Sequence, residues 1–256
     1  MFNQWPDKIH KAAEYIFTPF MYKGKFGKLA GLTLSNRPLV RELVHLTEHR
    51  KWFETINPTA VIDVGGYIGA FALAMRTMLP DARVYTFEPL PDNFEKLQAN
   101  MAGDEKFTAF QTALGDTAGT TDFWRCEFVA SSSVLPMEDL HKEAFPMTAC
   151  SMKVTVPIAR LDDYLPEMDL DGPVLMKLDV QGFEAQALAG AAETLKKVDY
   201  VLTEVSHQPL YEGQVTFEQL YDLMKSHGFT YSGGFDALIS PADGSILQTD
   251  ALFIRK

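Results

Sequence analysis

From residue 58 onward, short apolar runs alternate with segments whose apolar residues recur every three to four positions. Such runs are typical of strands buried on both faces, and the segments between them are typical of amphipathic helices. We expect strands at Ala60–Val64, Arg83–Glu88, Thr108–Gln111, Val174–Asp179 and Tyr200–Glu204. We expect helices near Ala70–Met78, Pro91–Met101, Phe183–Leu195 and Phe217–His227. This alternation predicts βαβ units and a largely parallel sheet, in which ligands bind beyond the carboxyl ends of the strands.

The two ends and the middle of the chain depart from this alternation. Residues 1–57 show helical spacing only, which predicts an N-terminal helical extension that caps the sheet; a lid over the substrate is the alternative. Residues 116–160 predict a loop-rich or short-strand insertion over the ligand site. Near the C-terminus, Thr230–Phe235 and Thr249–Arg255 flank a turn containing Asp243-Gly244, which predicts an antiparallel hairpin. We therefore divide the chain into an extension, 1–57, and an α/β domain, 58–256.

Composition limits the classes of partner. The chain has 256 residues, of which 46% are hydrophobic, and this length suits one large domain or one domain with an appendage. A net charge of -11 argues against a nucleic-acid partner. Cys126 and Cys150 lack metal-ligand spacing, which favours reduced thiols in a cytoplasmic protein. Neither a signal peptide nor a bilayer-spanning run is found, so we expect no membrane partner.

The first predicted strand ends in a glycine-rich turn, Asp63-Val64-Gly65-Gly66-Tyr67-Ile68-Gly69. Glycine allows a sharp bend or the close approach of a ligand, and the first amides of the following helix are unpaired donors. The spacing differs from the strict G-x-G-x-x-G pattern of dinucleotide-binding folds. The turn therefore predicts a nucleotide-type pocket without naming the ligand.

Two carboxylates near this turn discriminate between cofactors. Glu88 ends the second strand, where a carboxylate can accept both hydroxyls of a ribose. Asp63 lies two residues before Gly65, where it would repel a pyrophosphate and attract an ammonium or sulfonium group. The pair favours S-adenosylmethionine over NAD. An NAD-dependent oxidoreductase stays the alternative, because it would share the turn and Glu88.

Further polar residues follow the fourth and fifth strands. Lys177, Asp179 and Gln181 alternate with apolar neighbours, so they share one face where the strand leaves the sheet. Asp179 is a candidate general base or electrostatic partner of a sulfonium. Glu204 and His207 come to the same edge, and His207 is the best general-base candidate because its intrinsic pKa is near neutrality.

A minority interpretation groups four of these side chains around a divalent metal. Asp179, Glu184, Glu204 and His207 supply mainly hard oxygen ligands, which suit magnesium or calcium. Their spacing is not diagnostic, so we expect no metal ligands. Glu184 has a structural alternative, in which it complements the dipole of the helix that it opens.

Four blocks of the sequence resemble the FkbM family of class I S-adenosylmethionine-dependent methyltransferases. The blocks are Asp63–Gly69, Phe87–Phe94 with Leu97 and Asn100, Ala113–Asp116, and Lys177–Glu184 with Leu188–Ala191. The resemblance covers about residues 58–256. At two positions the chain departs from it, because Gly66 and Tyr67 replace the alanine and asparagine common in the family's loop.

The resemblance implies a Rossmann-like class I methyltransferase sheet of seven mostly parallel strands with a C-terminal antiparallel hairpin. It also implies roles around the cofactor: the turn would border the methionine part, Asp63 its ammonium, Glu88 the ribose, Pro89 and Leu114 the adenine, and Asp179 the sulfonium. Plain core packing is the alternative for Leu114. The candidate cofactor residues are Asp63, Gly65, Gly66, Tyr67, Gly69, Glu88, Pro89, Leu114 and Asp179, and the catalytic candidates are Asp179, Glu204 and His207.

The function expected from these residues and from the resemblance is methyl transfer to a hydroxyl on a small molecule, sugar or natural product. The choice of oxygen as acceptor rests on the family, because a fold does not fix a substrate. A non-catalytic S-adenosylmethionine-binding protein and an N- or C-methyltransferase are further alternatives. The sequence carries no signal for an oligomeric state.

Overall fold

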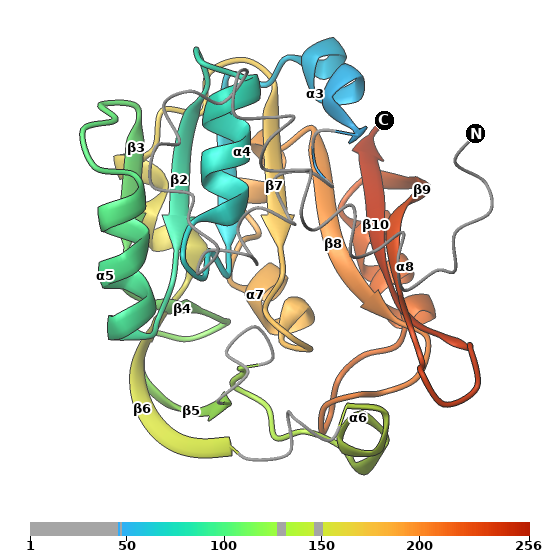
Figure 1. The fold of residues 1–256 in the computed structure, drawn as a ribbon. Coiled ribbons are helices and arrows are strands. Elements are labelled where there is room, and N and C mark those ends of the chain that lie inside the picture. The colour runs from blue at the N-terminus through green and yellow to red at the C-terminus, as the bar shows by residue number, and fades with distance from the viewer. Residues whose placement is uncertain (1–45, 47, 127–131, 146–150) are drawn as a thin grey trace, which may run out of the picture.

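The computed structural model describes residues 46, 48–126, 132–145 and 151–256. Its centre is a seven-stranded sheet in the order β3-β2-β1-β7-β8-β10-β9 (Figure 1). The strands are β1 (Ala60–Val64), β2 (Arg83–Phe87), β3 (Phe107–Phe110), β7 (Val174–Leu178), β8 (Tyr200–Ser206), β9 (Phe229–Ile239) and β10 (Ile246–Arg255). All neighbours pair in parallel except β10, which is antiparallel to both β8 and β9. The predicted parallel sheet with a C-terminal hairpin is confirmed.

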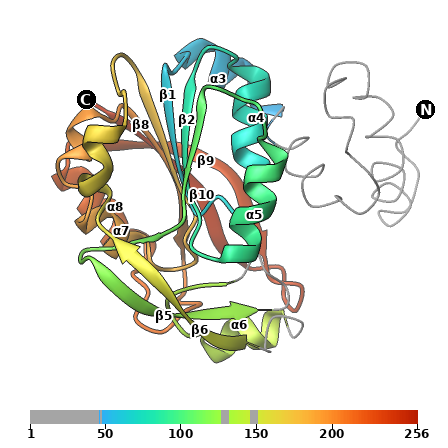
Figure 2. The same ribbon diagram turned by 90° about the vertical axis from the view of Figure 1, so that its left-hand side faces the viewer.

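Helices cover both faces of the sheet. Figure 2 shows α4 and α5 on one side and α7 and α8 on the other. Their bounds are α4 (Ala70–Met78), α5 (Pro91–Asn100), α7 (Glu184–Ala189) and α8 (Phe217–Ser226). The predicted helix Phe183–Leu195 is wrong in extent, because α7 ends at Ala189 and a short 3-10 helix, η5 (Thr194–Lys197), follows. Gly190 lies at the break, and a Cβ there would lie 1.9 Å from the carbonyl oxygen of Gly115, so this close passage of two segments leaves room only for glycine.

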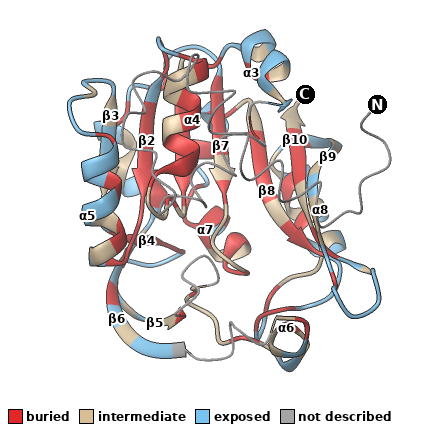
Figure 3. Cartoon of the chain, viewed as in Figure 1, coloured by how far each residue is buried: buried red, intermediate tan, exposed pale blue. Residues whose placement is uncertain are grey.

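Alternate residues of each central strand enter two different cores. Val61 and Leu175 pack with α4, whereas Ile62 and Met176 pack with α7 and α8. Burial of both faces accounts for the mainly apolar runs in the sequence. Figure 3 shows the result, with the central strands buried and the outer side of α5 exposed.

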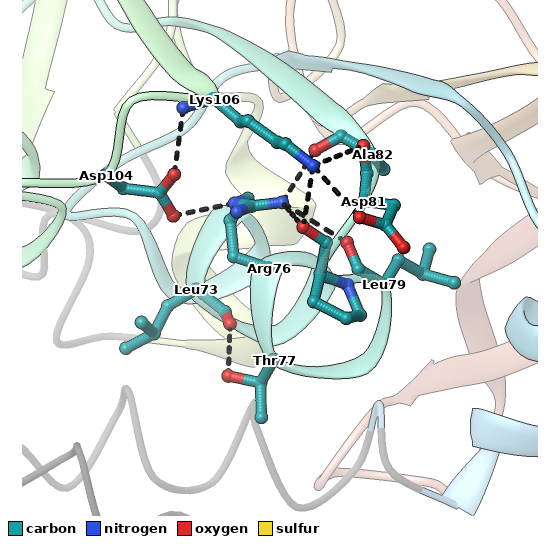
Figure 4. A network of polar contacts seen from close by, with 9 residues as sticks. Leu73, Arg76, Thr77, Leu79, Asp81, Ala82, Asp104 and Lys106 are labelled. Carbon is teal, nitrogen blue, oxygen red and sulfur yellow. Dashed lines mark hydrogen bonds and ion pairs between the residues drawn. The ribbon is translucent and has the colours of Figure 1, made fainter.

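Arg76 fixes the turn between α4 and β2 (Figure 4). This turn lies at the amino-terminal ends of the strands, away from the carboxyl ends of β1 and β2. Its Nε lies 2.6 Å from a carboxylate oxygen of Asp104, and its Nη1 donates to the carbonyls of Pro80 and Ala82 over 2.8 and 2.7 Å. The ion pair is largely shielded from water, with 13% and 23% of the two side chains exposed. The far end of α4 is thereby anchored.

The irregular segment forms a second, three-stranded sheet in the order β4-β6-β5. It comprises β4 (Ala113–Leu114), β5 (Gly119–Cys126) and β6 (Ser151–Ala159). The helix α6 (Asp139–Ala144) lies between β5 and β6 in the chain, and the 3-10 helix η4 (Leu161–Glu167) follows β6. Arg125 of β5 pairs with Asp92 of α5 at 2.5 Å, which links this sheet to the main domain. The expected short-strand insertion is therefore present.

Most of the predicted N-terminal extension lies outside the described residues, and its role stays a prediction. The part that is described contains α3 (Arg50–Ile56). Phe53 of this helix is fully buried in the core that α4 forms, and Trp52 contacts the rings of Tyr200 and Phe235 edge-on. Among the described helices, none combines the length and apolar character needed to cross a membrane.

Candidate active site

A cleft of about 860 Å³, a volume that includes its open mouth, lies beyond the carboxyl ends of β1, β2 and β7. The strand order reverses between β1 and β7, which is where parallel α/β sheets bind ligands. Seven of the predicted cofactor residues line this cleft, namely Gly65, Gly66, Tyr67, Glu88, Pro89, Leu114 and Asp179. Asp63 and Gly69 do not line it, although both belong to the turn that forms its floor.

The glycines of the turn are required by the close approach of other protein segments. Gly65 has a φ of 86°, and a Cβ there would lie 1.9 Å from the carbonyl oxygen of Asp179. A Cβ on Gly66 would lie 2.0 Å from the side chain of Thr86. Gly69, at the start of α4, also has a positive φ of 89°. The glycines therefore bring β1, β2 and the segment after β7 together around the cleft.

Tyr67 adopts the left-handed conformation at the tip of this turn, with a φ of 48°. Asparagine tolerates this conformation better than other residues with a Cβ, which gives a physical reason for the asparagine common at this place in the family. The backbone amide of Tyr67 donates to Oε2 of Glu88 over 2.9 Å. Burial, reinforced by the charges of Glu88 and Asp92, raises the pKa of the phenol.

Glu88 is held rigidly at the end of β2. Its Oε1 accepts from the amide of Leu90 at 2.9 Å and from Nδ2 of Asn93 at 3.3 Å, while Oε2 accepts from Tyr67. Burial raises the pKa of this carboxyl to about 7, because desolvation outweighs the three donors that favour the charged form. Glu88 thus presents a fixed acceptor to the cleft. Asn93, which completes this arrangement, was missed as a functional residue from the sequence.

Asp63 is fully buried beneath the turn. Its Oδ2 accepts from the hydroxyl of Thr86 at 3.3 Å, and its Oδ1 lies 4.0 Å from Nζ of Lys177. Asp63 therefore does not line the cleft, and its place near a ligand ammonium stays a prediction. Asp63 contributes negative charge from behind the glycines.

Asp179 lines the cleft directly after β7. Its two oxygens lie 3.1 Å from Nζ of Lys177 and 2.8 Å from Nε2 of Gln181. Lys177 also lines the cleft, and its ammonium stands 5.2 Å from the centre of the Phe71 ring. The sequence signalled Lys177 through its alternation with Asp179, but it did not show that the lysine would stand between two carboxylates.

A polar network continues from Asp179 into the protein. Nε2 of Gln181 donates to Glu204 over 2.9 Å, and the hydroxyl of the buried Tyr211 donates to Oε1 of Gln181 over 2.7 Å. Gln181 has a φ of 55°, so the turn after β7 is constrained at this residue. Burial and the charges of Asp179 and Asp250 raise the pKa of Glu204. Glu204 stands behind Asp179 and does not line the cleft.

Glu184 stabilises the same turn. Its Oε1 accepts from the amides of Val180 and Gly182, each at 3.2 Å, and burial raises its pKa to about 7. The structural interpretation of Glu184 therefore fits its contacts better than a metal ligand does. Among the described residues, no group of three or more His, Cys, Asp and Glu side chains is arranged to hold a metal ion.

His207 does not reach the cleft, so the structure does not support its expected role as general base. β8 continues through Ser206, which pairs with Gln248 of β10, and this carries the next residue past the sheet edge. The His207 ring is exposed. Its Nε2 lies 3.0 Å from the hydroxyl oxygen of Thr249, and its centroid lies 5.8 Å from that of the tilted Phe217 ring.

Comparison with known proteins agrees with the arrangement of these residues. Residues 63–231 match the model of the family described as Methyltransferase FkbM domain. The 2-O-methyltransferase NoeI of Sinorhizobium fredii is 31% identical over 173 residues, which cover 65% of this chain and 71% of that protein. The hexuronic acid methyltransferase AglP of Haloferax volcanii is 28% identical over 144 residues, which cover 56% and 54%.

A third relative is the 31-O-demethyl-FK506 methyltransferase FkbM of Streptomyces tacrolimicus, 25% identical over 205 residues that cover 70% of this chain and 76% of that protein. The family match takes in the glycine turn, Glu88 and the segment from Lys177 to Glu184. These are the residues that surround the cleft, and the family resemblance noted in the sequence is confirmed. The chain belongs to the FkbM family of S-adenosylmethionine-dependent methyltransferases.

Proposed function

We propose that this enzyme transfers the methyl group of S-adenosylmethionine to a hydroxyl oxygen of a small molecule, sugar or natural product. One observation carries the proposal. Glu88 and Asp179 follow the two strands on either side of β1, and both line one cleft with the glycine turn between them. A pair of carboxylates suits a ligand with ribose hydroxyls and a positive charge, and it disfavours the pyrophosphate of NAD.

The residues of the cleft fit the parts of this cofactor. The fixed carboxylate of Glu88 would accept the ribose hydroxyls, while Pro89 and Leu114 supply apolar surface for adenine. Gly65 and Gly66 would border the methionine part, with the charge of Asp63 beneath them. Asp179 would face the sulfonium. When bound, the cofactor supplies an electrophilic methyl group with a good leaving group, so the chain has to align the acceptor, exclude water and remove a proton.

The activities named for the relatives support oxygen as the acceptor atom. NoeI is a 2-O-methyltransferase, AglP acts on hexuronic acid, and FkbM acts on a 31-O-demethyl compound. Phe123 and Val134, from the insertion, line the cleft and offer apolar surface to a ring-shaped acceptor. A hydroxyl of a sugar or of a similar ring compound is the acceptor that these observations favour.

The test is a screen with S-adenosylmethionine labelled in its methyl group, over sugars, hydroxylated small molecules and peptides, with magnesium and with a chelator. We expect label in an O-methyl group of a hydroxylated acceptor, identified by NMR, at the same rate in both conditions. Transfer to nitrogen or carbon only would contradict the choice of oxygen. Binding of the cofactor without transfer to any compound would favour a non-catalytic binding protein.

A cytoplasmic location belongs to the same proposal. It is supported by the two cysteines of the chain, which are too few for a disulfide framework, and by a cofactor that is made inside cells. Fractionation of cells that produce the tagged protein would test it, and recovery outside the cytoplasm would contradict it.

A further inference from the structure

We propose that Lys177 is the general base of the methyl transfer and that Asp179 orients its amine; this inference rests on the proposed function. Among the described residues that line the cleft, Lys177 has the one basic side chain. It lies on β7, two residues before Asp179, so both side chains leave the strand on the same face. The position is therefore inside the site, next to the carboxylate expected at the reacting methyl group.

The surroundings of Lys177 are acidic and partly dry. Its Nζ lies 3.1 Å from Asp179 and 4.0 Å from Asp63, and 13% of the side chain is exposed. Glu204 on β8, with Asp250 of β10 beside it, adds negative charge from farther away, and α4 contributes the face of the Phe71 ring. In the absence of cofactor, these groups favour the protonated ammonium.

Binding of the cofactor changes this balance. Asp179, which pairs with Lys177 at 3.1 Å, is the carboxylate expected to face the cofactor's sulfonium, and Asp63 adds negative charge from behind the glycine turn. A second positive charge beside the same carboxylate disfavours the charged form of the lysine. Binding of the methyl donor therefore favours the neutral amine of Lys177 in the state in which a base is needed.

The proton transfer can be written without a further reactant. Nζ of Lys177 takes the proton of the acceptor hydroxyl and becomes an ammonium again. The acceptor oxygen forms its bond to the methyl carbon, and the electron pair of the broken carbon–sulfur bond stays on the sulfur of the cofactor product. Asp179 then pairs with the new ammonium, so the positive charge formed on Lys177 is compensated within the cleft. An amine is a stronger base toward a hydroxyl than a carboxylate, and His207 lies outside the cleft.

Proton release on cofactor binding tests the inference independently of turnover. Calorimetric titrations at pH 8.5, in two buffers of different ionisation enthalpy, give the number of protons released. At this pH Glu88 is already ionised, because its pKa is about 7. When S-adenosylmethionine binds, we expect the wild type to release about half a proton or more in excess of the number that Lys177→Gln or Lys177→Arg releases. Release by the cofactor's own amine is common to all three proteins and cancels in the difference.

S-adenosylhomocysteine is the matched ligand, because it lacks the sulfonium charge; we expect the Lys177-dependent release to be smaller with it. Lys153→Gln is the matched variant, since Lys153 pairs with Asp122 on the insertion and is 51% exposed. It should behave as the wild type. If Lys177→Gln does not fold, Lys177→Arg alone gives the comparison, because arginine stays protonated.

Kinetics give the second measurement. Lys177→Arg should lower kcat about 10²-fold or more with little change in cofactor affinity, and added primary amines should restore part of the activity of Lys177→Ala. Cofactor binding with equal proton release in the wild type and both variants would overturn the role of Lys177 and leave the proposed function standing. Failure of the wild type to bind S-adenosylmethionine would overturn the proposed function itself.

Discussion

The backbone amide of Tyr67 donates a hydrogen bond of 2.9 Å to the carboxylate of Glu88. This contact joins the tip of the glycine turn to the end of β2, across the wall of the cleft. It requires the left-handed backbone of Tyr67, with a φ of 48°, so the turn pays a conformational cost to fix the carboxylate. The acceptor expected for the ribose is therefore positioned before any ligand enters.

Tyr67→Asn separates the backbone of this residue from its side chain. Asparagine tolerates the left-handed conformation, so this change raises the free energy of unfolding by up to about 1 kcal/mol. Loss of the partly buried tyrosine ring lowers it by a similar amount. We expect the free energy of unfolding to change by less than about 1 kcal/mol, while the affinity for S-adenosylmethionine falls several-fold. Tyr67→Ala also removes the ring, but alanine does not tolerate the left-handed conformation as asparagine does. This variant should be clearly less stable in chemical denaturation. Unchanged affinity in both variants would show that the ring does not contact the cofactor.

Cofactor affinity should depend on pH through Glu88. Its pKa is about 7, and the ionised form accepts the ribose hydroxyls, so the affinity should rise between pH 6 and pH 8 by up to about tenfold. Glu88→Gln should bind more weakly with a smaller rise. An affinity that increases toward pH 6 in the wild type would contradict the assignment of the ribose to an ionised Glu88.

The same shift has the opposite consequence for the stability of the free protein. Because burial raises the pKa of Glu88 from 4.5 to about 7, its contribution to stability is fully present below pH 4.5 and is lost as the pH rises through 7. Glu184 has a raised pKa of about 7 and acts in the same direction. Denaturation of Glu88→Gln between pH 5 and pH 8 should therefore show a shallower decline than the wild type shows; an equal decline would assign the effect to Glu184.

The sequence predicted the sheet because apolar side chains fill both faces of its strands. Val61 and Ile62 face different helix layers, so both faces of β1 are apolar up to Asp63, near the end of the strand. Local signals failed where another segment decides the outcome. α7 ends just before Gly190, a position that has room only for glycine because Gly115 lies against it. The pairing of β10 with both neighbours extends the hairpin strands beyond the predicted bounds.

The candidate site was predictable to the extent that it lies in consecutive residues at strand ends. Glu88 and Asp179 follow apolar runs and reach the cleft, as the strand pattern indicates. Asn93 and Tyr211 belong to the site through contacts made in three dimensions, and no spacing in the chain signals them. His207 was misplaced because β8 runs farther than its apolar residues suggest.

Gly65→Ala tests whether the turn is shaped by its contact with the segment after β7. The new Cβ would lie 1.9 Å from the carbonyl oxygen of Asp179, in addition to the strain of a φ of 86°. We expect a loss of about 2–4 kcal/mol in the free energy of unfolding, together with weaker cofactor binding. Gly103→Ala is the matched control: its φ is 82° and a Cβ there has nothing within 4 Å, so it should cost only about 1 kcal/mol. Equal losses in the free energy of unfolding of the two variants would show that the backbone moves to relieve the contact between the new Cβ and Asp179.

Tyr211→Phe tests the network behind Asp179. Removing the hydroxyl leaves Oε1 of Gln181 without its 2.7 Å donor, which should cost about 1–3 kcal/mol in stability and lower kcat with little effect on cofactor affinity. Tyr85→Phe removes another buried hydroxyl, which accepts from the amide of Asp169 away from the cleft. That control should lose stability and keep kcat. A loss of kcat in both variants would assign the effect to stability alone.

Calorimetric titration of the wild type and Glu88→Ala with S-adenosylmethionine and with NAD tests the central claim most directly. The account predicts saturable binding of S-adenosylmethionine by the wild type, a loss of at least about tenfold in affinity for Glu88→Ala, and no binding of NAD by either protein. Binding of NAD without binding of S-adenosylmethionine, or equal affinities of the two proteins for S-adenosylmethionine, would contradict it.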